Sequence, residues 1–203
     1  IFAFRKRSSK LLTIVTLIII ILFISGAGPG YLGQNDYINY KIRYDNIGYT
    51  SLFESPQIGY TILMKMGNFL NLDFFSFRLV ITSICMMLMY QRLIKQYAYN
   101  SNYIMSLYML YPMIIDSEHF RNFIAMTIFL VSIRFLERNL VRNKIIFLIL
   151  ILIAASVHTA FIFYVPLILV NANNKNKLVK RIAITTLVLT ICAFLNNNQV
   201  PFL

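Results

Sequence analysis

Long apolar runs alternate along this chain with short clusters of lysine and arginine, and this alternation restricts the fold more than any other feature. The cluster RKRSSK (5–10) directly precedes the apolar run LLTIVTLIIIILFIS. Of the 203 residues, 59% are hydrophobic and only 13% are charged, which is too apolar for a soluble domain of this size. We therefore predict an all-α integral membrane protein whose basic clusters mark the cytoplasmic side.

The net charge of +12 does not indicate a nucleic-acid partner. The basic residues form short clusters between apolar runs, whereas a nucleic-acid surface needs a continuous basic patch. Cys85 and Cys192 each lie inside an apolar run without a Cys/His or CxxC spacing, so we interpret them as small core residues. The histidines and acids are scattered, and we predict neither a metal site nor a cofactor.

The first apolar run predicts a membrane helix with a cytoplasmic N-terminus. A cleaved signal peptide is the alternative, because small residues follow at 25–27. Residues 28–72 are polar and rich in tyrosine, so we place them in an outer loop. Within this loop, Ser55-Pro56 resembles a helix start. An apolar stripe on one helical face predicts an amphipathic helix at the membrane surface; its members are Ile58, Ile62, Met66, Phe69 and Leu70.

Asn71 can end that helix, and Asp73 can cap an inward helix over 74–95. Residues 103–115 then run outward, and a helix that starts at Asp116 returns. The apolar stretch 144–170 predicts a short hairpin that turns at 156–159, because a single span would place the basic residues 173–181 outside. With a last helix at 182–195, we expect roughly seven membrane segments in one domain, 1–203. The first residue, Ile1, and the trailing NNNQVPFL favour a fragment of a longer protein.

Arg121 is the most informative residue of the outer side. A helix that starts at Asp116 puts this cation in or just after the first turn, where the helix dipole disfavours it. A salt bridge to Asp116 or Glu118, or snorkelling to the interface, would be a purely structural explanation. Neither explains the small Ala125 one turn later, which leaves room beside the guanidinium. Because guanidinium binds phosphate and carboxylate bidentately, we interpret Arg121 as an anion-binding residue.

Other outer residues are open to two interpretations. Arg78, a second membrane-embedded arginine, is either structural or substrate-binding. Asp36 and Asp45 are either solvated loop acids or the base that glycosyl transfer from a diphosphate requires. His158 is either a polar turn residue or part of that site. The loop tyrosines could offer stacking surfaces to sugars, although tyrosine is also common at membrane interfaces; they are Tyr31, Tyr37, Tyr40, Tyr44, Tyr49 and Tyr60.

Four stretches together resemble the EpsG family of bacterial exopolysaccharide proteins, which are Wzy-like polymerases. They span nearly the whole chain in the family's order: GQNDYINYKIRY (33–44), ESPQIGYTILMK (54–65), FRNFIAMTIFLVSIRFLERN (120–139) and AASVHTAFIFYVPL (154–167). The resemblance carries over to Asp36, Tyr40, Glu54, Arg121 and His158. Asn122 departs from the glutamine expected after the arginine, and family members run several helices longer.

The resemblance implies that undecaprenyl-diphosphate-linked repeat units are joined at the outer face of the bacterial cytoplasmic membrane to make exopolysaccharide or capsule. The implied partners are the lipid-linked oligosaccharide, the membrane, a chain-length regulator and other polysaccharide-assembly proteins. We expect Arg121, with His158, to bind the diphosphate, and Asp36 or Glu54 to activate the acceptor hydroxyl. Tyr40 and Arg78 are expected to contact substrate.

Two alternative functions stay open on the sequence. A flippase or transporter of lipid-linked sugar would place charges near the membrane midplane, and the charges here collect at the outer rim. A membrane acyltransferase that modifies the polysaccharide would need a His/Asp pair. His119 and Asp116 have a suitable i, i+3 spacing on a helix.

Overall fold

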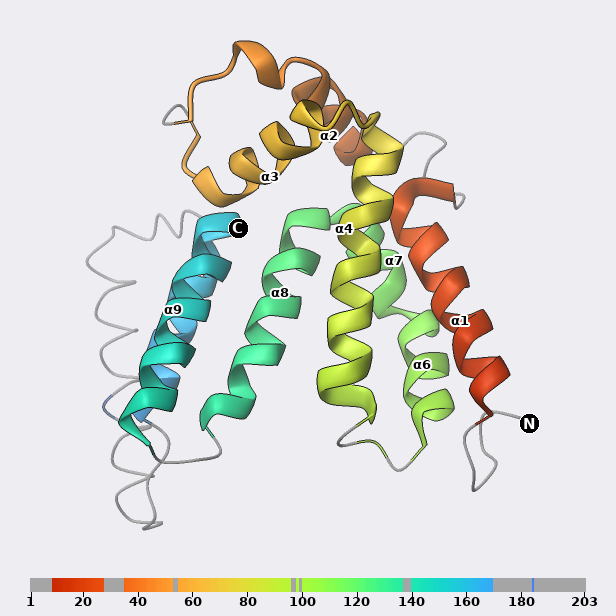
Figure 1. The fold of residues 1–203 in the computed structure, drawn as a ribbon, viewed down its shortest axis with the longest axis vertical. Helices are drawn as coiled ribbons and strands as arrows, with labels where there is room; N and C mark the ends of the chain where they lie inside the picture. Colours follow the sequence, from red (N-terminus) through yellow and green to blue (C-terminus); the bar gives the residue numbers. More distant parts are fainter. Residues whose placement is uncertain are drawn as a thin grey trace.

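The structure, a computed structural model, describes residues 9–27, 35–52, 55–95, 98, 100–136, 140–169 and 184. The described residues form helices and loops and no strand, which confirms the all-α prediction. Most helices run side by side, and α2 (Asn35–Asp45) and α3 (Ile58–Phe69) lie across one end of them (Figure 1). We call the segment made by α2, the 3-10 turn Ile47–Tyr49 and α3 the cap.

The helices beneath the cap alternate in direction. Helices α1, α6, α7 and α9 run toward the cap, and α4 and α8 run away from it (Figure 1). Helix α8 packs against α4 and α9, and α1 packs against α6. The elements are α1 (Lys10–Leu22), α4 (Phe74–Met89), α6 (Ser101–Leu110), α7 (Pro112–Glu118), α8 (Phe120–Ile133), α9 (Val141–Val157) and the 3-10 helix η7 (Thr159–Leu169).

Within the described residues, one helical stretch is long and apolar enough to cross a membrane. It covers Phe74–Ile94, 21 residues, in which α4 continues through a π-helical turn, Tyr90–Ile94. The apolar helices Lys10–Gly26 and Thr159–Ile168 are shorter. Exposed aliphatic side chains cover the outward faces of α1 and α9, among them Ile14 and Ile18 on α1 and Ile145 and Ile149 on α9. Exposed apolar faces of this kind mark surfaces that contact a membrane or another protein.

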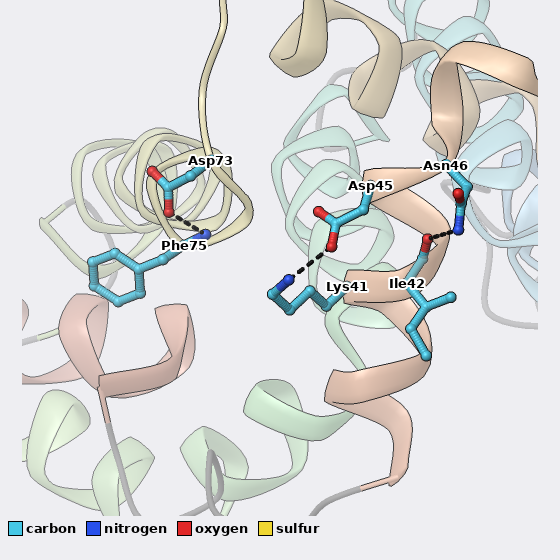
Figure 2. A network of polar contacts seen from close by, with 6 residues as sticks. All are labelled: Lys41, Ile42, Asp45, Asn46, Asp73 and Phe75. Atoms are coloured by element: carbon cyan, nitrogen blue, oxygen red, sulfur yellow. Dashed lines mark hydrogen bonds and ion pairs between the residues drawn. The ribbon is translucent and has the colours of Figure 1, made fainter.

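The cap and α4 carry several local polar contacts (Figure 2). The Asp73 carboxylate accepts a hydrogen bond from the Phe75 N–H at 3.1 Å. The prediction that Asp73 is the N-cap residue of the inward helix, α4, is therefore confirmed. On α2, Lys41 and Asp45 form an ion pair at 2.7 Å, and both side chains are half exposed. An exposed i, i+4 pair adds about 0.3–0.5 kcal/mol. Asp45 is thus a solvated acid.

Two predicted helix starts are wrong. Helix α3 starts at Ile58, and Ser55 does not cap it: the Ser55 hydroxyl accepts the Gln57 N–H at 3.2 Å and an Arg43 N–H at 2.6 Å. The outer return helix starts at Phe120, because the backbone of His119 is not helical (φ −94°, ψ 59°) and separates α7 from α8. Asp116 therefore lies within α7. Arg121 still falls in the first turn of its helix.

Helix α2 was not predicted, and it changes the role of the loop tyrosines. Tyr37, Tyr40 and Tyr44 lie on the face of α2 that packs on the core, and all three are buried. Tyr60 of α3 is buried as well, while Tyr49 is 94% exposed. The proposed sugar-stacking role is therefore wrong for the four buried rings. Their i, i+3, i+7 spacing on α2 is a helical signal that the polar composition of the segment concealed.

The hairpin turn at 156–159 is confirmed. Helix α9 ends at Val157, His158 takes an extended conformation, and η7 returns along α9. The outward arm has 17 residues and spans about 25 Å, which is longer than predicted because α9 starts at Val141 and not at 144. Asn71, with φ 54°, follows the end of α3 in the left-handed conformation, as its position predicted. The last predicted helix, 182–195, lies outside the described residues apart from Ile184, and so does Cys192.

The cap rests on α9 through Gly59. A Cβ at this position would lie 2.9 Å from the Ser156 carbonyl carbon and closer still to its hydroxyl. Because backbone cannot move aside easily, Gly59→Ala is expected to lift α3 and to lower the free energy of unfolding by about 1–3 kcal/mol. Thermal unfolding of the purified protein in detergent measures this effect. Gly48→Ala is the matched control, since a Cβ there meets no atom within 4 Å.

Candidate functional site

Arg121 joins the first turn of α8 to the cap. Its Nε donates a hydrogen bond to the Tyr40 hydroxyl at 2.9 Å, and one terminal nitrogen donates to the Gln57 side-chain oxygen. The guanidinium carbon also lies 5.0 Å from the centre of the Tyr40 ring. Both hydrogen-bond acceptors are neutral, so they orient the guanidinium without cancelling its charge. Two separate parts of the cap thus hold a half-buried cation where the helix dipole is already positive.

His158 contributes a second basic group at the same end of the molecule. Its Nδ1 is buried and has no partner in the described structure. Burial, with Arg121 and then His119 nearby, lowers the pKa of His158 below its ordinary value. The imidazole is therefore neutral at pH 7. A neutral imidazole can accept a proton or donate one hydrogen bond, whereas an imidazolium can only donate.

The depressed pKa of His158 predicts a pH-dependent stability. Between the folded-state pKa and the ordinary value near 6.5, the unfolded chain binds more protons, so stability falls as pH falls through this interval. We expect the thermal unfolding midpoint to drop on acidification below about pH 6.5, and His158→Gln to flatten that dependence. His119→Gln should weaken it only partly, because burial and Arg121 contribute more than His119 to the lowered pKa of His158. An unchanged profile in His158→Gln would contradict the assignment.

Asp36 lies close to His119, a contact that the sequence did not predict. Asp36 lies in the first turn of α2, and its carboxylate is 3.7 Å from the His119 Nδ1. The two side chains are 48% and 56% exposed, so both are accessible from the cap side. Asp116, the residue whose spacing from His119 left an acyltransferase open, accepts a hydrogen bond from the Tyr108 hydroxyl. Asp36 and His119 are far apart in the sequence, and no local spacing signals their contact.

Arg78 lies in the core and not at a surface. One terminal nitrogen donates to the Ile24 carbonyl at 2.5 Å and to the Ser117 carbonyl at 2.8 Å. The guanidinium carbon lies 4.4 Å from the centre of the Phe120 ring and 4.9 Å from that of Tyr37. The side chain is fully buried. These contacts tie α2, α7, α8 and the π-helical turn after α1 (Phe23–Ala27) to α4, so the structure supports the structural interpretation of Arg78.

The remaining predicted features have mixed outcomes. Glu54 lies outside the described residues. Its neighbour Ser55 binds Arg43 of α2, which brings a further cation to the cap. Ala125 is completely buried, so the room expected beside Arg121 is filled by the protein. Cys85 is a buried free thiol, as expected of a core residue. The described residues contain no cluster of three or more potential metal ligands.

The described residues form an all-helical protein with one apolar span and, at one end, a cap that holds a cationic site. A family model for the EpsG family matches residues 10–201. The chain therefore belongs to the EpsG family, and its role lies in exopolysaccharide synthesis. The apolar span and this membership indicate a membrane protein. No curated protein and no solved structure matches the chain.

Proposed function

We propose that the protein polymerises lipid-linked oligosaccharide repeat units at the outer face of the bacterial cytoplasmic membrane. The observation that carries the proposal is the cationic site under the cap, where Arg121 and His158 come together. A diphosphate group matches this site, because guanidinium binds phosphate oxygens bidentately. Membership of a family that acts in exopolysaccharide synthesis supplies the context.

The multi-pass arrangement in the membrane is part of the same proposal. Several basic residues lie at the ends of the helices opposite the cap: Lys10 begins α1, Arg134 follows α8, and Arg142 lies in the first turn of α9. Under the positive-inside rule these ends are cytoplasmic and the cap is outside. The exposed stripe of α3 then lies at the outer membrane surface, where Phe69 is 85% exposed.

The reaction we propose is a glycosyl transfer. An acceptor hydroxyl oxygen attacks the anomeric carbon of the sugar attached to the diphosphate, a C–O bond forms, and the bond from that carbon to the phosphate oxygen breaks. Arg121 stabilises the negative charge that develops on the departing lipid diphosphate, and His158 donates a hydrogen bond to it. The acceptor proton goes to Asp36, which His119 assists by holding the carboxylate in place.

Deletion of the gene in its own host tests the proposal. The surface polysaccharide is sized, and the lipid-linked pool is extracted from the membrane. We expect long chains to disappear while single repeat units remain linked to the carrier on the outer leaflet. Repeat units trapped on the inner leaflet would point to a flippase, and chains of normal length without acyl groups would point to an acyltransferase. Either outcome would overturn the polymerase assignment.

Complementation relates the phenotype to the site. The wild-type gene is expected to restore long chains, and the Asp36→Asn gene is expected to restore few. The variant should fold normally, because the Asp36 side chain is half exposed. The described chain offers a matched control in Asp45→Asn, an equally exposed acid on the same helix. Equal complementation by the two variants would remove Asp36 from the mechanism.

A further inference from the structure

A groove of about 430 Å³ lies directly beneath the cap. Helices α3, α4, α8 and α9 each contribute to its wall, which is mostly aliphatic. Its volume falls in the range of about 300–1,000 Å³ that is typical of ligand pockets. Lining residues from all four helices are Ile62, Ile81, Ile84, Leu88, Ile128 and Ile153.

The hydroxyl groups in the groove are engaged within the protein. Thr127 Oγ1 donates to the Phe123 carbonyl at 2.9 Å, and Ser156 Oγ donates to the Ile153 carbonyl at 2.7 Å. Neither hydroxyl donor is left for a ligand. A sugar requires many hydrogen-bonding groups, and burying it here would leave its hydroxyls unsatisfied. The wall therefore selects a hydrocarbon occupant.

The groove follows the helix that is long enough to cross a membrane. Ile81 and Leu88 both line it, and they are about 10 Å apart along α4 at 1.5 Å per residue. Both lie inside the candidate span Phe74–Ile94. The groove thus reaches from the cap toward the middle of the apolar layer, where a lipid chain would enter from the side.

The upper end of the groove meets the cationic site. Gly59 and Val157 line this end. Gly59 follows two residues after Gln57, the partner of Arg121, and Val157 directly precedes His158. Ile124, another lining residue, is one helical turn below Arg121. A molecule with an anionic head group and a long apolar tail fits the cationic site and the groove at the same time.

We propose that this groove binds the isoprenoid tail of the lipid-linked diphosphate, with the diphosphate at Arg121 and His158. The proposal rests on the proposed function in one respect, namely that the substrate is a polyprenyl diphosphate. It adds the residues that distinguish carrier-linked sugars from free sugar diphosphates. The tail holds the substrate in a fixed register, and the anomeric carbon is thereby positioned outside the membrane next to Asp36.

Site-specific photocrosslinking tests the groove directly. Benzophenone-alanine is placed at Ile84 or at Met87, and the full-length protein is reconstituted in phosphatidylglycerol nanodiscs with undecaprenyl diphosphate. The two positions are a matched pair, because both lie on α4 and are 52% and 53% exposed, but only Ile84 lines the groove. We expect polyprenyl adducts by mass spectrometry at position 84 and phospholipid adducts at position 87. Phospholipid adducts or crosslinks to the protein's own residues 170–203 at position 84 would overturn the proposal.

The contribution of the head is measured in the same assay. Arg121→Gln is expected to reduce the adduct with undecaprenyl diphosphate at position 84 at least tenfold and to leave the adduct with uncharged undecaprenol unchanged. An equal loss of adduct for both probes would mean that the groove has collapsed. No loss of the undecaprenyl diphosphate adduct would mean that Arg121 does not bind the diphosphate of a lipid held in the groove. Either result contradicts the proposed binding mode. Polyprenyl adducts in a protein whose deletion leaves polysaccharide length unchanged would refute only the polymerase function.

A larger side chain that fills the groove gives a second test, which is measured in cells as the amount of long-chain polysaccharide. Ile84→Trp is expected to reduce long-chain polysaccharide about tenfold, whereas Met87→Trp should have little effect because its side chain points outside the groove. Both variants are checked for equal amounts in the membrane. Full polymer length in a well-folded Ile84→Trp protein would show that the tail binds elsewhere.

Discussion

Arg121→Gln is expected to reduce polymer formation by about 100- to 1,000-fold, which is the loss seen when one preorganised donor to a developing anion is removed. The physical reason is the setting of the guanidinium. Tyr40 and Gln57 hold it in place through neutral acceptors, so its charge is directed at the ligand. Chain length of the polysaccharide from cells that carry the variant measures the effect.

Arg121→Lys separates the charge from the planar fork. A lysine keeps the positive charge, but it cannot donate to Tyr40 and Gln57 and still present two parallel N–H groups to a phosphate. We expect an activity between those of the wild type and Arg121→Gln. Full activity of the lysine variant would show that bidentate binding is unnecessary. Arg134→Gln, which removes the same charge at the opposite end of α8, is the control and should be silent.

Arg78→Met is expected to lower the stability of the whole helical assembly by about 2–6 kcal/mol, because two buried carbonyls lose the donor that they share. Methionine replaces the unbranched stem of the arginine without its guanidinium, and it leaves the Ile24 and Ser117 carbonyls without the donor that serves both. Each orphaned buried acceptor costs about 1–3 kcal/mol. The thermal unfolding midpoint and the folded yield after membrane extraction report this loss.

Arg92→Met is the control for this experiment, since Arg92 lies at the far end of the same helical stretch and is exposed. It should change stability little. Arg78→Lys keeps the charge and can reach one carbonyl at best, so it should also be destabilised. A stable Arg78→Met protein would mean that desolvation of the guanidinium offsets its contacts, and Arg78 would then not be the residue that holds the helices together.

Local signals predicted several element boundaries correctly. Asp73 caps its helix because its carboxylate needs only the backbone of the next two residues, and Asn71 ends α3 because asparagine tolerates positive φ. The turn at His158 followed from charge, since one long span would have moved a basic cluster to the wrong side. In each case the deciding atoms lie within a few residues or in the pattern of one segment.

Other features depended on contacts between distant segments. By sequence alone, Arg78 and Arg121 look alike, as arginines near the outer ends of apolar helices. The tertiary structure distinguishes them: Arg78 is enclosed by the Phe120 and Tyr37 rings and by carbonyls of two other helices, whereas Arg121 is held at the edge by the cap. The Asp36–His119 contact and the burial of the α2 tyrosines arose in the same way.

The sequence by itself determined that the chain is helical and apolar, where its hairpin turns, and which ends carry the basic residues, because hydrophobicity and charge act segment by segment. The tertiary structure alone decided which polar side chains face the core and which meet under the cap. That choice depends on how α2 and α3 pack over α4, α8 and α9, and their packing is a property of all these segments together.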